Sequence, residues 1–110
     1  MSVQHKQLAE GRWNNMPFVE QMANIGSEVS RALNWKQKNN SVYLQKAFER
    51  ALELTDLTLD DARNRSRLKE IARMREAMVD YFAGDNMFVS SETSWRKYFL
   101  SFAYAARRGR

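Results

Sequence analysis

The chain has 110 residues, of which 44% are hydrophobic and 28% are charged, with one proline and no cysteine. This length suits a single domain, and the apolar content excludes wholesale disorder. The lack of cysteine excludes disulfides and thiolate metal sites. No apolar run approaches the roughly 18 residues that a membrane span requires. The polar N-terminus lacks the apolar stretch of a signal peptide, so we expect a cytoplasmic protein.

The positive charge is unevenly distributed along the chain. The formal net charge is +5, yet residues 1–94 hold 13 basic and 13 acidic side chains that cancel. The whole excess lies in residues 95–110, which contain no acid. Residues 63–75 form a second basic segment, with six cations against Glu70 alone. Both segments are expected to attract polyanions.

The first helix is expected to begin near Pro17 and to end around residues 38–40. Proline suits the first helical position because its missing N–H would have no partner there. Apolar residues recur from Phe18 to Leu33 at steps of three and four and form one stripe. Gly26 lies in this helix at a cost of about 1 kcal/mol, which indicates that another helix approaches closely there.

Three more helices follow in the pattern. Ser41 is a plausible N-cap for the second, which should end near residues 55–56. Residues 58–61 resemble a cap for the third, with the Thr58 hydroxyl facing the Asp61 amide. This helix should run to about Ala83, where Gly84 can adopt the left-handed conformation.

The inner faces of the last two helices are also predicted from their spacing. The inner stripe of the third helix is predicted to be Leu68, Ile71, Ala72, Met78, Val79 and Phe82. Ser90 or Ser91 should cap the fourth helix. Its inner face is predicted to hold Trp95, Phe99, Phe102 and Ala106.

Short connections between successive helices favour antiparallel neighbours. We therefore predict an all-α fold, an up-and-down antiparallel four-helix bundle formed by one domain over residues 1–110. Residues 1–16 are predicted to be an N-terminal arm, which either contains a short helix or packs Trp13 onto the bundle. Residues 107–110 are predicted to be a flexible basic tail.

Signatures of catalysis are sparse. His5 is the only histidine, and the four glycines are isolated, so a histidine-based triad and a phosphate-binding glycine loop are not predicted. Glu49 and Glu53 share a helix face at i,i+4 and could bind a metal or act as an acid–base pair. Because Lys46 and Arg50 are interleaved with them, a solvated face is favoured. We predict a protein that is not an enzyme and has no cofactor and no metal.

The basic segments carry the functional hypothesis. Arg65, Lys69 and Arg73 would form one stripe on a continuous helix, with Arg63 and Arg67 as a parallel pair. Such a row can follow a phosphate backbone. The alternative is a solvated helix neutralised by acids. The predicted nucleic-acid-binding residues are Arg63, Arg65, Arg67, Lys69, Arg73, Arg96, Lys97, Arg107, Arg108 and Arg110. Their pattern favours neither RNA nor DNA and indicates no sequence specificity.

Aromatic residues are denser in the last helix than one core face requires. Tyr98 and Tyr104 could be partly exposed and stack on bases or contact a partner. A subunit interface is favoured, because exposed aromatic patches most often mark protein contacts. Trp35 is a candidate interface residue at the end of the first helix. A homo-oligomer is therefore expected.

Three stretches carry a resemblance that covers most of the chain. Residues 20–32 (EQMANIGSEVSRA) followed by Trp35 and Lys36, residues 47–54 (AFERALEL) and residues 80–86 (DYFAGDN) resemble a small prokaryotic helical family of about this length. This resemblance implies no site, because no function is associated with that family.

In size, basic charge and helix count, the chain is also similar to the four-helix accessory variability proteins of diversity-generating retroelements. Those proteins form ring-like oligomers and associate with a reverse transcriptase and nucleic acid. The similarity is at the level of the fold. It implies a non-enzymatic accessory protein that binds nucleic acid and partners a reverse transcriptase. The alternative is a homo-oligomeric scaffold or adaptor that binds protein alone.

Overall fold

The computed structural model describes residues 11–108, which are almost entirely helical and contain no strand in that range. The predicted all-α class is therefore confirmed. The long helices are α2 (Phe18–Gln37), α3 (Ser41–Asp60), α4 (Leu68–Ala83) and α5 (Glu92–Arg108), and a 3₁₀ segment, η1 (Ala62–Arg67), joins α3 to α4. None of the helices in the described range has the length and apolarity needed to cross a membrane.

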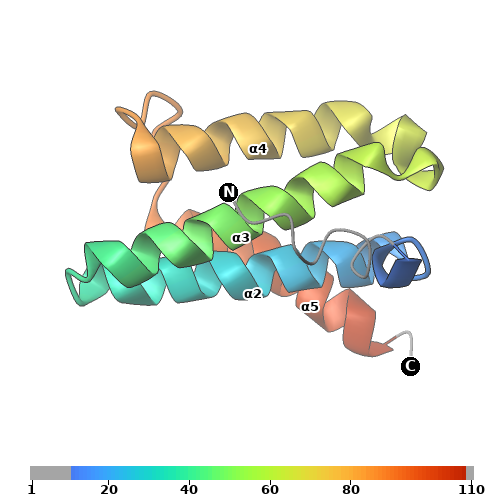
Figure 1. Cartoon of the computed structure of the whole chain (residues 1–110), viewed down its shortest axis with the longest axis horizontal. Coiled ribbons are helices and arrows are strands. Elements are labelled where there is room, and N and C mark those ends of the chain that lie inside the picture. Colours follow the sequence, from blue (N-terminus) through green and yellow to red (C-terminus); the bar gives the residue numbers. More distant parts are fainter. Residues whose placement is uncertain (1–10, 109–110) are drawn as a thin grey trace.

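Helix α2 is the central element. It packs along α3 on one side and against α5 on the other, while α4 rests on α3. Figure 1 shows α2, α3 and α4 as neighbouring rods and α5 crossing α2 obliquely. Helices α4 and α5 meet chiefly through side chains, so the fold is a set of packed helices, and the regular up-and-down bundle stays a prediction. The core consists of Trp13, Met22, Ile25, Val29, Leu33, Phe48, Ala51, Ile71, Met74, Met78, Trp95 and Phe99.

The crossing of α2 and α5 depends on Gly26. A Cβ atom built on Gly26 would lie 2.7 Å from the Cβ of Phe99, closer than two carbon atoms can pack. The glycine predicted to admit a neighbouring helix does so, and that neighbour is α5.

The boundary between the second and third helices differs from the prediction. Helix α3 continues to Asp60, five or so residues beyond the predicted end, and Thr58 is buried inside it. Asp61 caps η1 instead, because its carboxylate accepts a hydrogen bond from the Arg63 amide. At the start of α3 the N-cap is Asn40, whose side chain accepts from the Tyr43 amide.

Helix α4 buries Ile71 and Met78 as predicted, and Val79 and Phe82 pack against the core, but its inner face differs from the prediction at two positions. Leu68 is 39% exposed, and Met74 is buried. Leu68 is the first residue of α4 and directly follows η1, inside which Asn64 has non-helical dihedral angles.

The connection between α4 and α5 is tightly hydrogen-bonded. Gly84 has an ordinary negative φ, and the left-handed residues are Asn86 and Val89, both at φ 55°. The Asp80 carboxylate accepts from the amides of Met87 and Phe88 at 2.7 and 2.9 Å. Helix α5 then starts as predicted, with the Ser91 hydroxyl accepting from the Ser94 amide.

Replacing Gly26 with alanine should destabilise the fold. The added methyl group overlaps Phe99, and overpacking of this kind costs about 1–3 kcal/mol. Chemical denaturation should show this loss for Gly26→Ala. Gly11→Ala is the matched control, because the space around its Cβ position is open. An equal effect of the two substitutions on the free energy of unfolding would contradict the close approach.

Candidate nucleic-acid interface

The predicted basic stripe is divided in two by η1. Arg63 and Arg65 lie in the 3₁₀ segment, whereas Lys69 and Arg73 lie on α4. Helical i,i+4 alignment therefore holds for Lys69 and Arg73, and the prediction that Arg65 continues their row is wrong. The physical reason is that Arg65 lies in a 3₁₀ segment, which completes a turn in about three residues, and that Arg67, just before α4, has φ −113° and ψ 7°. Beside this segment lies a buried hydrogen-bond network.

Gln21 is the centre of this network, which we call the polar hub. Its side chain is fully buried on α2, and its amide donates to the Trp13 carbonyl and to Asp61 Oδ2 at 3.0 and 2.8 Å. Its amide oxygen accepts from Asn64 Nδ2 at 2.9 Å. Gln21 thereby ties the start of α2 to the end of α3 and to η1.

Asn64 and Thr58 complete the polar hub. The Asn64 amide also donates to the Thr58 carbonyl at 3.0 Å, which pairs a carbonyl at the end of α3. The Trp13 indole donates to the Thr58 hydroxyl at 3.0 Å. This bond fixes the segment before α2 on the bundle, as the second interpretation of the N-terminal arm predicted. Residues 1–10 of that arm lie outside the described residues.

Arg63 is committed to the polar hub. Its guanidinium donates to Asp61 Oδ2 at 2.7 Å and to the Met16 carbonyl at 2.6 Å. Hydrogen bonding by Arg63 holds the pKa of the Asp61 carboxyl well below its ordinary value, against the opposing effect of burial. Arg63 is therefore less available to a phosphate than the sequence suggests.

Arg67 of η1 contacts α5 indirectly, through Phe18 of α2. Its guanidinium lies 4.5 Å from the centroid of the Phe18 ring, and Phe18 packs edge-on against Phe102 of α5 at 5.9 Å. The last turns of α5 follow Phe102 and carry Arg107 and Arg108. Figure 1 shows η1 and the last turns of α5 at the same end of the molecule but apart from each other. The two basic segments, some 40 residues apart in sequence, are thus linked through Phe18 and Phe102.

Two predictions about the remaining cations need correction or qualification. Arg107 and Arg108 belong to α5 and not to a flexible tail, and Arg110 lies outside the described residues. The Arg96 guanidinium is occupied, since it donates to Glu92, Ser30 and Asn34 and so ties α5 to α2. The hydrogen bond from Arg96, with a second from Gln37, lowers the pKa of Glu92. Lys97 is exposed next to it.

The predicted interface aromatics have different environments. Tyr98 is half-buried and donates to Glu70 Oε2 of α4 at 3.2 Å, and burial with this neighbouring carboxylate raises its pKa. Tyr104 is 59% exposed. Trp35 stacks on Tyr43 of α3 at 4.8 Å and so covers the far end of the helix pair.

Sequence reasoning missed two features. The polar hub was missed, although Gln21 interrupting the apolar face of α2 was its signal. The other missed feature is the exposed apolar run Met87-Phe88-Val89 in the connection between α4 and α5. No group of acidic or histidine side chains in residues 11–108 could hold a metal ion.

Comparisons with protein-family models, with curated proteins and with solved structures return no match to this chain.

The low pKa of Asp61 predicts a specific loss of stability in acid. The folded protein binds a proton at Asp61 less readily than the unfolded chain, whose pKa is about 3.9. The contribution of Asp61 is therefore complete near neutral pH and declines as the pH falls below about 4. Asp61→Asn should lower the free energy of unfolding at pH 7 by about 1–3 kcal/mol.

Urea denaturation at pH 7 and at pH 2.5 measures this dependence. The difference between the parent and Asp61→Asn should shrink at the lower pH. Asp60→Asn, at an exposed neighbouring position, controls for the general loss of a carboxylate. A parent–variant difference that is the same at both pH values would contradict the role of the Asp61 charge.

Proposed function

We propose that the protein is a non-enzymatic accessory protein that binds nucleic acid through the end of the fold at which both of its basic segments lie. This basic end consists of Arg65, Arg67, Arg107 and Arg108, and Lys69 and Arg73 extend it along α4. The observation that carries the proposal is the packing of Arg67 on Phe18 and of Phe18 on Phe102. Through α2, these contacts link η1 to the part of α5 that precedes Arg107 and Arg108.

The charges of the basic end are free to act outward. Within residues 11–108, neither Arg65 nor Arg107 forms an ion pair. Arg67 lies over an aromatic face, which leaves the donors at the edge of its guanidinium available to phosphate. Of the two nearby acids, Asp61 is paired with Arg63, whereas Glu70 accepts a hydrogen bond from the neutral Tyr98 hydroxyl, which does not cancel a carboxylate charge.

The form of binding follows from these contacts. Arginine donors on helix surfaces bind the phosphate backbone without reading bases. We therefore propose RNA or DNA binding with little sequence preference. The similarity to accessory variability proteins makes a reverse transcriptase the protein partner to test first, by co-purification.

Charge reversal at the basic end should weaken binding of nucleic acid. We expect Arg65→Glu/Arg107→Glu to lower the slope of log affinity against log salt concentration by about 0.7–0.9 for each lost phosphate contact. Gel shifts of a labelled RNA and a labelled DNA over a salt series measure this slope. The double variant takes one cation from each segment, so it tests their convergence.

Lys38→Glu/Lys46→Glu is the charge-matched control. It makes the same change in net charge at the opposite end, where α2 ends and α3 begins. Binding should survive in this control. If both double variants lose the same affinity and slope, net charge is responsible and the basic end is not the site.

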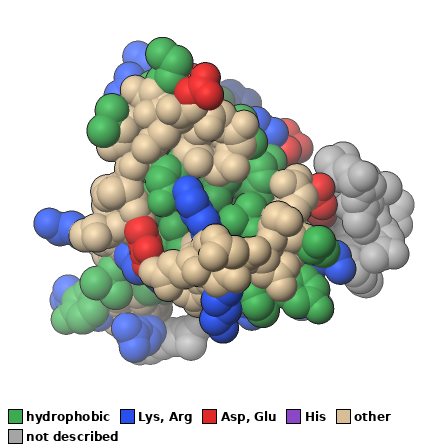
Figure 2. Space-filling model, turned by 90° about the vertical axis from the view of Figure 1, so that its left-hand side faces the viewer, with side chains coloured by type: hydrophobic (Ala, Val, Ile, Leu, Met, Phe, Trp, Pro, Cys, Tyr) green, Lys and Arg blue, Asp and Glu red, His purple; other side chains and the backbone are tan. Residues whose placement is uncertain are grey.

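A second candidate function, a homo-oligomeric scaffold, is favoured by the connection between α4 and α5. Met87, Phe88 and Val89 are 79%, 57% and 83% exposed, and we call them the apolar finger. Figure 2 faces the end of the molecule at which α4 finishes, and apolar side chains stand at its rim. The amides of Met87 and Phe88 donate to the Asp80 carboxylate, and these two hydrogen bonds hold the backbone of the finger. Rigid exposed apolar groups favour protein contacts.

The occupant proposed for the apolar finger is a second copy of this chain. Phe88→Ser with Met87→Ser should shift the protein from oligomer to monomer in sedimentation equilibrium. Leu100→Ser, at another exposed apolar position, should leave the oligomer intact. A parent protein that is monomeric at high concentration would exclude this candidate and leave the nucleic-acid proposal untouched.

A further inference from the structure

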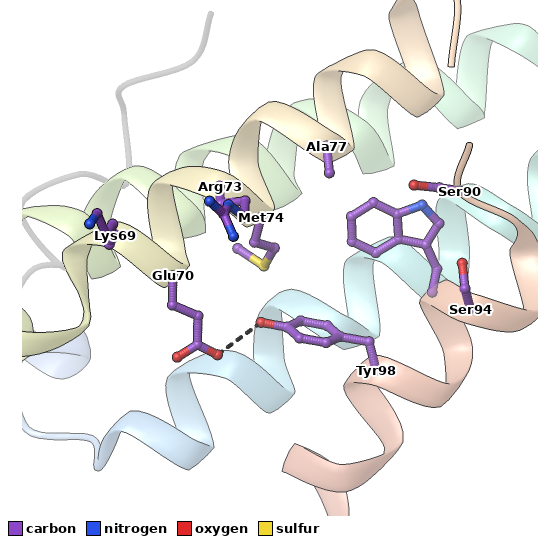
Figure 3. Close-up of a pocket in the computed structure, with 9 residues that line it drawn as sticks. Lys69, Glu70, Arg73, Met74, Ala77, Ser90, Ser94 and Tyr98 are labelled. Atoms are coloured by element: carbon purple, nitrogen blue, oxygen red, sulfur yellow. Dashed lines mark hydrogen bonds between the residues drawn. The ribbon is translucent and has the colours of Figure 1, made fainter. Parts of the chain in front are cut away.

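A cleft of about 490 Å³ opens between α4 and α5. Figure 3 shows the two helices facing each other across it, with Met74 and Ala77 on the α4 side and Tyr98 on the α5 side. The dashed line marks the Tyr98–Glu70 hydrogen bond that joins the helices. The walls are mostly apolar, so the cleft suits a flat or apolar group.

Trp95 lines this cleft and contains an unpaired donor. The residue is 5% exposed, and its Nε1 has no hydrogen-bond acceptor among residues 11–108. A buried donor without an acceptor costs about 1–3 kcal/mol, and such groups are rare in folded proteins. Ser90 and Ser94 also line the cleft, yet neither accepts from the indole. The unpaired N–H indicates a ligand that brings its own acceptor.

Positive charge lies at the other end of the cleft. In Figure 3, Lys69 and Arg73 lie away from Ser90 and Ser94. Neither cation forms an ion pair with a carboxylate in residues 11–108. The cleft therefore has Lys69, Arg73 and the Glu70 carboxylate at one end, apolar walls in the middle, and hydroxyl groups with the buried indole N–H at the far end.

We infer that the cleft receives one unpaired nucleobase of a single-stranded nucleic acid, with the adjoining phosphate held by Lys69 and Arg73. A base supplies a flat ring for the walls and carbonyl or ring-nitrogen acceptors for Trp95 Nε1. Arg73 precedes Ala77 by one helical turn, about 6 Å of helix. The cations thus lie one sugar-and-phosphate step from the apolar walls. A duplex does not fit, because its bases are stacked and paired inside.

This inference rests on the proposed function and makes it narrower. Phosphate contacts at the basic end bind single strands and duplexes alike. A cleft that holds a base adds affinity for single strands alone. The preference for single strands over duplexes therefore separates the cleft from the basic end.

Filling the cleft tests the inference without changing a charge. Ala77→Leu places a larger side chain in the cleft, and Ala103→Leu makes the same change in the groove between α2 and α5. Fluorescence anisotropy should compare a labelled oligothymidylate with a hairpin duplex of the same length. We expect Ala77→Leu to bind the single strand about tenfold more weakly and the duplex within twofold of the parent. Ala103→Leu should resemble the parent on both.

The indole N–H gives a second measurement that does not depend on affinity. Thymidine 5′-monophosphate should shift the Trp95 Nε1–H resonance, assigned by its loss in Trp95→Phe, whereas inorganic phosphate should not. Arg73→Gln should weaken the response to the nucleotide. Thermal unfolding of each variant shows whether it is folded.

Three outcomes would overturn the inference. In the first, the parent binds the single strand and the duplex with equal affinity, and the Trp95 indole resonance does not move. Binding would then be explained by the basic end alone. Another is displacement of the oligonucleotide from the cleft by an acidic peptide of equal charge, which indicates a protein ligand. A parent protein that binds neither nucleic acid at low salt would overturn the proposed function as well.

Discussion

The buried amide of Gln21 determines how the rest of the chain is placed. One side chain bonds the carboxylate of Asp61, the amide of Asn64 and the carbonyl of Trp13. These bonds pair polar groups at the end of α3 that would otherwise be buried without partners. They also hold Asn64 outside helical geometry, so η1 and α4 leave α3 in a defined direction. Burying a network of polar groups is costly unless each group has a hydrogen-bond partner. Here Arg63 completes the network by donating to the Asp61 carboxylate.

The same network divides the cations into two groups. Arg63 and Arg96 form hydrogen bonds within the protein and connect helices. Arg65, Lys69 and Arg107 project from elements that the network and the Phe18–Phe102 contact hold together. Exposed ion pairs contribute little to stability, so the fold gains little by neutralising these cations. Their charge remains available to a polyanion, which is the physical basis of the proposed function.

The apolar finger and the cleft lie at different places on the molecule and favour different partners. The apolar finger exposes hydrophobic side chains at the end of α4. The cleft, by contrast, has apolar walls with Lys69 and Arg73 beside them. A second copy on the finger would leave the basic end uncovered, because the finger and the end of α5 lie at opposite ends of the fold (Figure 1). Oligomerisation and nucleic-acid binding are therefore compatible in one assembly, with several basic ends acting together.

Local periodicity was enough to predict the helical class, the buried stripe of α2, the close approach at Gly26 and the Ser91 cap. The class, the stripe and the cap depend on residues within a few turns of one another, so the sequence by itself determined them. A glycine inside a helix indicated a close neighbour at Gly26, and only the tertiary structure shows that this neighbour is Phe99. The extension of α3 past Thr58, the exposure of Leu68 and the 3₁₀ segment that carries Arg65 were not predictable in this way. The end of α3 and η1 are held by Gln21, about 40 residues distant, which bonds Asp61 and Asn64. The cleft and its unpaired indole N–H likewise form only where α4 and α5 face each other. The tertiary structure decides such features because contacts with distant side chains select among local conformations of similar energy.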